Sequence, residues 1–324
     1  MRHWASVRPS ASTSQTLLVS SMSRISRRQF LKVLGVASFL VPPYIRQLLA
    51  QEKRPDILVI KGDPELALRR GFKLLGGVER FIKSGSRVLI KPNLSFSAPP
   101  EWGATTSPGV IRALSKICLD AGVKKVIVAD HTIRSPDACF DKSGVREAIK
   151  DLDNVVLKDL NRERDYIEVE VPGKALKKTE IARITQKVDT FINLAQAKCH
   201  SATGVSLGMK GLMGLIWDRG YLHAQVNLHQ AIGDLALVLK PDLVVVDATR
   251  VLLTKGPSGP GRVENPKEII MGTDPVAVDS LAVSRYRWYG RSFKGSDVRH
   301  LIAAFENGAG EIDIEKLNVK EVTL

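Results

Sequence analysis

The residues most able to do chemistry in this sequence come directly after four apolar runs. The runs end at positions 90, 129, 194 and 246, and the polar residues that follow them are Lys91, Asn93, Asp130, Lys198, His200 and Asp247. Lysine and histidine neutralise anionic groups or move protons, and carboxylates accept protons or bind cations. Singly, each residue is explained as simply by a helix cap, a surface charge or a turn. Together they indicate a shared cleft.

The elements that would position these residues alternate along the chain. Apolar, β-branched runs at 57–60, 87–90, 126–129, 190–194 and 243–246 alternate with helical patterns, one of them expected from about Pro64 to Phe81. A helix opening at Ser107-Pro108 and stopping at Gly122 makes residues 87–130 a predicted βαβ crossover. The fold class predicted is therefore α/β, with a mainly parallel sheet and flanking helices.

Residues 151–187 are more charged and less regular than the rest, so a smaller inserted subdomain or an edge hairpin is expected there. In open α/β sheets, ligands bind at the carboxyl ends of the strands. The polar residues named above are therefore expected to converge in one cleft.

The segment 201–214 is rich in glycine. Gly204, Gly208 and Gly211 are expected on one face of a helix, where a ligand or a backbone can approach closely. A helix start at Ser201 or Thr203, with Lys198 just ahead, would offer amide groups to an anion. Neither phosphate-binding glycine motif, G-x-x-x-x-G-K-[ST] or G-x-G-x-x-G after a strand, occurs, so nucleotide binding is not predicted.

Three clustered histidines raise the possibility of a divalent metal. His200, His223 and His229, with Asp247 or Asp130, could supply nitrogen and oxygen ligands, although the spacings match no known metal signature. Hydrogen-bonded structural or acid-base roles are the alternative. The three cysteines, Cys118, Cys139 and Cys199, show no C-x-x-C spacing, which excludes an iron-sulfur cluster bound by this chain alone.

Charge does not identify a partner. The formal net charge is +14, but residues 1–50 contribute seven basic residues and no acidic one, which leaves 41 basic against 34 acidic residues in the remainder. That excess suits an anionic small molecule, and no aromatic and basic residues interleave as in nucleic-acid-binding surfaces. We therefore expect no nucleic-acid partner. The Gly- and Pro-rich run 255–261 is expected to form a lid or a plain surface loop.

The residue pattern near the amino terminus is typical of a targeting segment. Residues 26–32, S-R-R-Q-F-L-K, precede a short apolar run and resemble a twin-arginine export signal, although a short buried helix is the alternative. This predicts a signal and leader over residues 1–50, a domain over 51–324, and contact with the twin-arginine translocase during export. The protein is then periplasmic or extracytoplasmic, and Met22 is the expected start.

Beyond single residues, the ordered motifs resemble the family called domain of unknown function 362, in its twin-arginine-exported branch, from about Pro55 to Val319. The motifs are Ile90-Lys91-Pro92-Asn93, Thr106-Ser107-Pro108, Lys198 through His200, the glycine-rich run with Lys210, the His223 and His229 segment, and Gly272 to Asp279. The resemblance implies that the site residues are Lys91, Asn93, Lys198, His200, Lys210, Asp247, Asp274 and Asp279.

Many members of that family carry a ferredoxin-like domain with cysteine clusters, which implies redox work for the group. This chain lacks that domain, so a redox role would need a partner protein or a bound non-sulfur cofactor. The first hypothesis is an exported enzyme or redox accessory that holds an anionic substrate or cofactor in a cleft. His200, Lys198 and Asp247 are its catalytic candidates, and Lys91, Asn93, Lys210, Asp130, Asp274 and Asp279 are its binding candidates.

Two other classes remain open from the sequence. One is a non-catalytic protein that binds a metal or cofactor, and the other is a subunit of a membrane redox complex.

Overall fold

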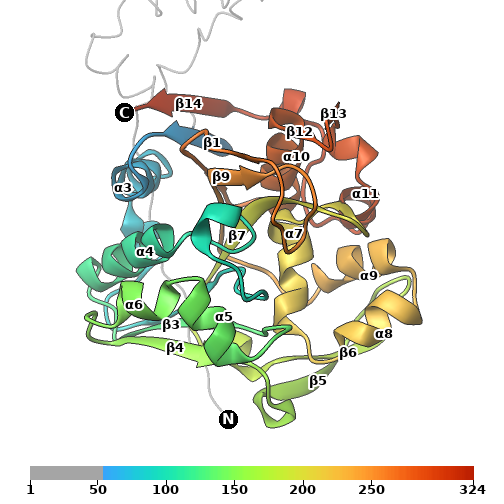
Figure 1. Ribbon diagram of the computed structural model, residues 1–324, viewed down its shortest axis with the longest axis horizontal. Coiled ribbons are helices and arrows are strands. Elements are labelled where there is room, and N and C mark those ends of the chain that lie inside the picture. The colour runs from blue at the N-terminus through green and yellow to red at the C-terminus, as the bar shows by residue number, and fades with distance from the viewer. Residues whose placement is uncertain (1–53) are drawn as a thin grey trace, which may run out of the picture. The chain divides into compact units, whose positions relative to one another are not determined.

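A computed structural model describes residues 54–324, which lie within one compact unit (Figure 1). The twin-arginine pattern and the expected start at Met22 fall outside the described residues. None of the described helices is both long and apolar enough to cross a membrane.

A ten-stranded sheet forms the centre of this unit. Its strands lie in the spatial order β14 (Val319–Thr323), β1 (Ile57–Lys61), β11 (Glu268–Gly272), β9 (Leu243–Leu252), β7 (Thr190–His200), β2 (Arg87–Lys91), β3 (Lys125–Asp130) and β4 (Val155–Asp159), with β10 (Val263–Glu264) beside β9 and β8 (Gly204–Val205) beside β7. The pairs from β9 through β7, β2 and β3 to β4 are all parallel. The predicted α/β class with a mainly parallel sheet is confirmed.

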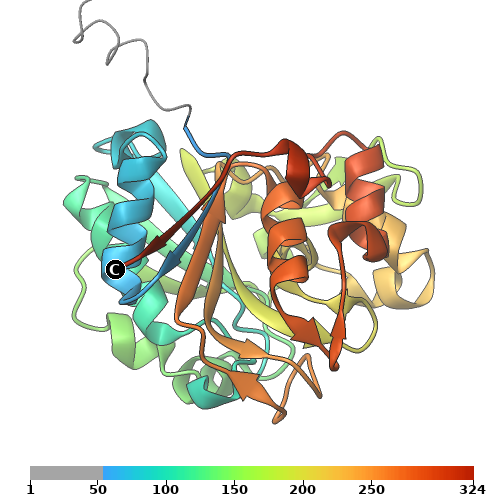
Figure 2. The same ribbon diagram turned by 90° about the horizontal axis from the view of Figure 1, so that it is seen from above.

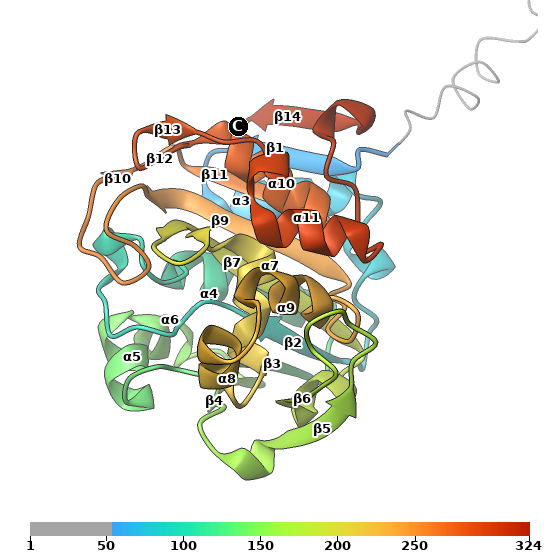
Figure 3. The same ribbon diagram turned by 90° about the vertical axis from the view of Figure 1, so that its right-hand side faces the viewer.

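Helices cover both faces of the sheet, as Figure 2 shows. One face carries α3 (Pro64–Leu74), α4 (Pro108–Asp120), α5 (Pro136–Lys142) and α6 (Val145–Ile149). The other carries α7 (Leu207–Gly211), α9 (Leu228–Leu235), α10 (Pro275–Arg285) and α11 (Arg299–Glu306), with α8 (Arg219–Ala224) beside α9 (Figure 3). Side chains alternate between the two cores, because successive strand residues point to opposite faces: Leu89 packs in one core and Val88 and Ile90 in the other.

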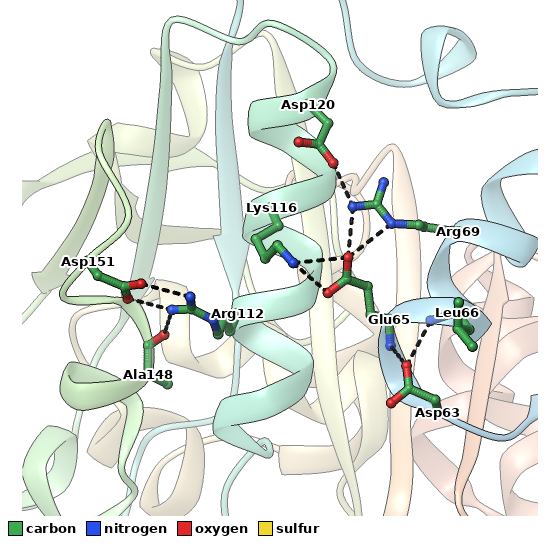
Figure 4. Close-up of polar contacts among 9 residues, drawn as sticks. All are labelled: Asp63, Glu65, Leu66, Arg69, Arg112, Lys116, Asp120, Ala148 and Asp151. Atoms are coloured by element: carbon green, nitrogen blue, oxygen red, sulfur yellow. Dashed lines mark hydrogen bonds and ion pairs between the residues drawn. The ribbon is translucent and has the colours of Figure 1, made fainter.

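The predicted crossover over residues 87–130 is present, since β2 and β3 are parallel and α4 connects them. On the outer side, Glu65 of α3 contacts both Arg69 and Lys116, and Arg69 also reaches Asp120 of α4 at 2.6 Å (Figure 4). These exposed ion pairs orient the two helices but contribute little free energy individually.

Among the eight strands of the main order, two pairings are antiparallel, and the short strands β8 and β10 also pair antiparallel with β7 and β9. β11 lies between β1 and β9 and is antiparallel to both. The reason is the connection: residues 253–267 contain no helix, only the short strand β10 that folds back on β9. A parallel return needs a longer crossover, so the chain turns back antiparallel.

Several predicted boundaries are wrong by a few residues. The first helix ends at Leu74, not Phe81, because Gly76 and Gly77 adopt φ values of +106° and +98° that break it. The strands predicted over 190–194 and 243–246 are longer, and they end at His200 and Leu252. In the stretch 151–187, where the sequence predicted a smaller inserted subdomain or an edge hairpin, the structure has β4 and then an antiparallel hairpin of β5 (Tyr166–Glu170) and β6 (Lys178–Ala182).

The predicted glycine-rich helix is also shorter than expected. Gly204 lies in strand β8 with φ +78°, and α7 begins only at Leu207. The helix then continues as a 3-10 turn over Leu212–Leu215. Ser201 and Thr203 therefore do not start a helix.

Candidate functional site

The carboxyl ends of β2, β3 and β7 meet at one edge of the sheet, beside a cavity of about 680 Å³. Lys91 is the last residue of β2 and Asp130 the last of β3, while β7 contributes Lys198 and His200. The second wall comes from α7, the 3-10 turn after it and α8. The residues that these elements and the connection between them place on the cavity include Lys210, Gly214, Trp217, Arg219 and His223.

A buried ion pair lies at the base of the site. Lys91 Nζ is 3.1 Å from Asp130 Oδ1, and the two side chains are 2% and 0% exposed. The other carboxylate oxygen of Asp130 accepts hydrogen bonds from the amide of Leu94 at 2.7 Å and the hydroxyl of Ser95. Burial lowers the pKa of Lys91, and the charge of Asp130 opposes that effect.

Gly214 makes room for this pair. A Cβ atom added there would stand 2.1 Å from Asp130 Oδ1 and 2.8 Å from Lys91 Nζ. Of the three glycines at which the sequence predicted a close approach, Gly208 shows one, since its added Cβ would lie 2.9 Å from Asp279 Oδ1, while at Gly211 the nearest atom is at 3.7 Å. At Gly204 no atom lies within 4 Å of an added Cβ.

Lys198 is fully buried and has no carboxylate within ion-pair distance among residues 54–324. Its Nζ donates to Asn93 Oδ1 at 3.0 Å and to the carbonyl oxygen of Ala104, and it lies 4.6 Å from the centre of the Phe96 ring. Removal from water, which disfavours the charged form, lowers the pKa of Lys198 to about 7. This lysine is held in place by neutral acceptors.

Lys210, on α7, is the most accessible of the three cavity lysines, at 9% exposed against 2% for Lys91 and 0% for Lys198. It forms no hydrogen bond or ion pair with any residue of the described part of the chain. Burial, followed by the positive charges of Arg219 and Lys91, lowers the pKa of Lys210 to about 7. A nearly buried amine without a partner is unusual in a folded protein.

Helix α7 is anchored by Asp279. Its carboxylate accepts hydrogen bonds from the amides of Gly208 at 2.9 Å and Met209 at 2.7 Å. Burial raises the pKa of Asp279 to about 7. The first amides of α7 are thus occupied, so the expected amide site for an anion is not formed, and Asp279 positions the helix that carries Lys210.

An aromatic wall closes one side of the cavity. The rings of His131 and Trp217 are stacked, with centroids 5.5 Å apart and an interplanar angle of 5°, and Tyr166 packs against both. Arg219 donates to the backbone carbonyls of His131 and Thr132. Sequence reasoning missed Trp217 and Arg219 as site residues, because they follow a helical turn rather than a strand.

Hydrogen bonding defines the tautomers of two cavity histidines. His131 Nδ1 must donate to the carbonyl oxygen of Ile216 at 3.0 Å, which leaves Nε2 as an acceptor. His200 Nδ1 accepts from the amide of Ala202 at 3.1 Å, which leaves Nε2–H as a donor. Burial and the charge of Lys210 lower the pKa of His200 to about 2, so this ring is neutral.

Besides Asp130 and Asp279, which lie behind the cavity wall, two more predicted site aspartates do not line the cavity. Asp247 accepts from the amide of Ser107 at 2.7 Å and from the amide and hydroxyl of Thr249, and so it ties the start of α4 to β9. Asp274 caps α10 by accepting from Val276 and Ala277, and its second oxygen accepts from the amide of Glu311. Asp247 is buried and Asp274 is half-buried, and backbone donors to their carboxylates take the place of a charged partner.

The three histidines proposed as metal ligands are not brought together. His200 and His223 line the cavity, but His229 stacks on His300, with ring centroids 6.1 Å apart. Within residues 54–324, no three histidine, cysteine or acidic side chains are grouped closely enough to hold a metal ion. The reason is topological: His229 is on α9, which faces α11 rather than the sheet edge.

The remaining predicted features lie near the cavity rim. Pro257, within the Gly- and Pro-rich loop, lines the cavity, and the amide of Gly256 donates to Cys199 Sγ at 3.1 Å. A Cβ on Gly256 would stand 2.0 Å from the carbonyl oxygen of Cys199, so the loop packs closely on the end of β7. All three cysteines are buried and none forms a disulfide bond; Cys139 lies in α5 and Cys199 in β7.

The cavity is cationic overall. Four basic side chains line it, Lys91, Lys198, Lys210 and Arg219, and only Lys91 has a carboxylate partner. The single acidic lining residue, Asp218, is exposed and accepts from the amide of Tyr221. In surroundings of low dielectric, such an excess of positive charge favours an anion.

Comparisons with known proteins identify relatives of this chain. A family model described as "Domain of unknown function (DUF362)" matches residues 88–284. The thylakoid-associated protein sll1697 of Synechocystis is 24% identical over 67% of this chain, which spans 64% of that protein's length.

Two solved structures are also similar in part. One is a protein from Thermotoga maritima, at 14% identity and a TM-score of 0.38, with 57% of this chain and 51% of that chain covered. The other is the lactate racemase apoprotein from Thermoanaerobacterium thermosaccharolyticum, at 16% identity and a TM-score of 0.35, with 60% and 51% covered.

Proposed function

The chain belongs to the DUF362 family, and we propose that its cavity binds a small organic anion whose negative group lies among Lys198, Lys210 and Arg219. One observation carries this proposal: two lysines at least nine-tenths buried line the same cavity without a carboxylate partner. Burying an amine without compensation is unfavourable, and a bound anion supplies the compensation.

The shape and chemistry of the walls narrow the ligand class. Besides the cations, the cavity presents Phe96, Met213 and the ring of Trp217 stacked on His131. Ligand pockets typically combine such apolar surfaces with a few polar groups that orient the ligand. We therefore propose a carboxylate or phosphate with an apolar body, rather than an inorganic ion alone.

The same cavity is equipped for proton transfer, which favours an enzyme over a passive binding protein. His131 offers an unprotonated Nε2 and His200 offers Nε2–H, so an acceptor and a donor line one space. The neutral His131 ring can accept a proton at Nε2, and the neutral His200 ring can donate a hydrogen bond that stabilises negative charge developing on an oxygen.

We also propose that the protein works outside the cytoplasm after twin-arginine export. This rests on the S-R-R-Q-F-L-K pattern at residues 26–32. The translocase would be a transient partner of the amino-terminal segment only.

The binding proposal is tested by a thermal-shift screen of carboxylates and phosphates on the intact chain. A ligand that binds the native state raises Tm as its concentration increases. Lys198→Met and Lys210→Met should each lose most of the shift. The matched control is Lys124→Met, which removes an exposed lysine just before β3, at the opposite end of that strand. Equal shifts in all four proteins would refute the proposal.

A further inference from the structure

The three cavity lysines have three different environments, and only one leaves the amine uncommitted. Lys91 is paired with Asp130, and Lys198 donates to Asn93 and Ala104. Lys210 has no partner among the described residues and is the most exposed of the three. If an anion only needed positive charge, Lys198 and Arg219 would supply it. The arrangement therefore leaves the amine of Lys210 free for another role.

We propose that Lys210 is a nucleophile that forms an imine with the carbonyl carbon of a 2-oxo acid bound in the cavity. The inference rests on the proposed anion site, because the carboxylate of the 2-oxo acid is the anion that Lys198 and Arg219 would hold. It adds a covalent step and a substrate class to that site.

The surroundings of Lys210 favour the neutral amine, which is the nucleophilic form. Burial and neighbouring positive charge act in the same direction, and together they lower the pKa of Lys210 to about 7. The groups that affect this amine or are affected by it are Lys91 on β2, Lys198 and His200 on β7, Arg219 and His223 on α8, and His300 on α11. Helix α10 also packs against α7, and the carboxylate of its Asp279 accepts hydrogen bonds from the amides of Gly208 and Met209. None of the charges that shift the pKa of Lys210 is a carboxylate that would restore the ammonium form.

The step balances without an outside oxidant or reductant. The lone pair of the Lys210 Nζ attacks the carbonyl carbon while the carbonyl π electrons move to oxygen, which takes a proton. The nitrogen loses a proton, a second proton lets the hydroxyl leave as water, and a positively charged iminium remains. The iminium withdraws electrons from the neighbouring bond, so the reaction class is proton exchange or carbon-carbon cleavage next to the carbonyl carbon.

Lys198 fits the proton transfers that this step requires, and His200 can polarise the carbonyl group by a hydrogen bond. Lys198 shares the cavity and, with a pKa of about 7, can give and regain a proton near neutral pH. His200 Nε2–H is a donor for the carbonyl oxygen. These residues would assist the reaction, and only Lys210 would be modified.

The test is reductive trapping on the intact protein. Pyruvate and phenylpyruvate, each with sodium cyanoborohydride, convert an imine into a stable secondary amine, which peptide mapping by mass spectrometry locates. We expect an adduct at Lys210 with at least one probe, formed at least about tenfold faster than at exposed lysines at pH 7, where an ordinary lysine is almost wholly protonated. Its rate should level off above about pH 7, unlike the rate at exposed lysines.

Lys210→Arg keeps the charge but removes the nucleophile, so the adduct should vanish and not move to Lys198. Lys124→Met is the control that should trap like the wild-type protein. Absence of an adduct at Lys210 with both probes, an adduct at Lys198 instead, or labelling spread evenly over surface lysines would each overturn the imine proposal.

Thermal shifts with acids that lack the ketone distinguish a wrong imine proposal from a wrong anion-site proposal. Propionate and 3-phenylpropionate carry the same negative charge without the ketone. If they raise Tm in a Lys210-dependent manner but no imine is trapped, the anion site stands and the nucleophile proposal falls. If neither these acids nor the 2-oxo acids bind, both proposals fall.

Discussion

Gly214 lies directly against Asp130, so closely that a Cβ atom added to the glycine would stand 2.1 Å from the carboxylate Oδ1. The same atom would also lie 2.8 Å from Lys91 Nζ. The turn after α7 thus rests on the buried ion pair at the ends of β2 and β3. This contact joins the two walls of the cavity.

Gly214→Ala should therefore damage the site through packing alone. The added methyl group has to displace the carboxylate or the turn, and overpacking of this kind costs about 1–3 kcal/mol. We expect a lower free energy of unfolding, measured by urea denaturation, together with weaker anion binding.

Gly211→Ala is the matched control for that change. Its added Cβ would meet Asn193 Oδ1 at 3.7 Å and Lys91 Nζ at 3.9 Å, which are ordinary contacts. If the two alanine variants were equally stable, the tight contact at Gly214 would have no energetic importance.

The pH dependence of stability should reveal the unpaired lysine. The pKa of Lys210 falls from 10.5 to about 7 on folding, so above pH 7 the unfolded chain binds more protons than the folded one. Below about pH 7 the amine is charged in both states, and the full cost of burying the charge lowers the free energy of unfolding. Above about pH 7 the folded protein loses this proton, so the free energy of unfolding rises with pH.

Lys210→Met should flatten this rise and stabilise the ligand-free protein near pH 7 by at least about 1 kcal/mol. Denaturation is best compared from about pH 7 to about 8, below the ordinary cysteine pKa of about 8.5. An identical pH slope in the variant and the wild type would contradict the lowered pKa of Lys210.

The variant Asp247→Ala distinguishes a structural role of Asp247 from a catalytic one. Loss of the carboxylate leaves the amide of Ser107 buried without its acceptor, which should cost about 1–3 kcal/mol. We expect a lower Tm and unchanged anion affinity, measured by calorimetry below the melting range. Affinity lost with stability intact would restore the catalytic role that the sequence predicted.

Export is tested in the amino-terminal segment. Changing both Arg27 and Arg28 to Lys keeps the charge but removes the guanidinium pair that the proposed signal requires. The precursor should then remain in the cytoplasm, as shown by fractionation and immunoblotting. Normal export of the double variant would disprove the twin-arginine route.

Much of the site was predictable because strand ends carry a clear sequence signal. The apolar runs before Lys91 and Asp130 end abruptly in charged residues, so the meeting of β2 and β3 followed from the α/β pattern. The extension of β7 to His200 was not predictable, since residues 195–199 are small or polar and become buried only by tertiary packing.

Other features depend on contacts between distant segments. Trp217 becomes part of the cavity by stacking on His131, which is far away in sequence. Asp247 and Asp274 have the residue type and position of site residues, but their oxygens are taken by backbone amides. Sequence alone does not show which donors surround a buried carboxylate.

The most direct test of the anion site is a crystal structure of the protein with the carboxylate that gives the largest thermal shift. We predict that the carboxylate lies inside the cavity, within hydrogen-bond distance of at least two of Lys198, Lys210 and Arg219, and that the apolar body of the ligand lies against Trp217. An anion bound elsewhere on the surface, with only water beside Lys198 and Lys210, would contradict it.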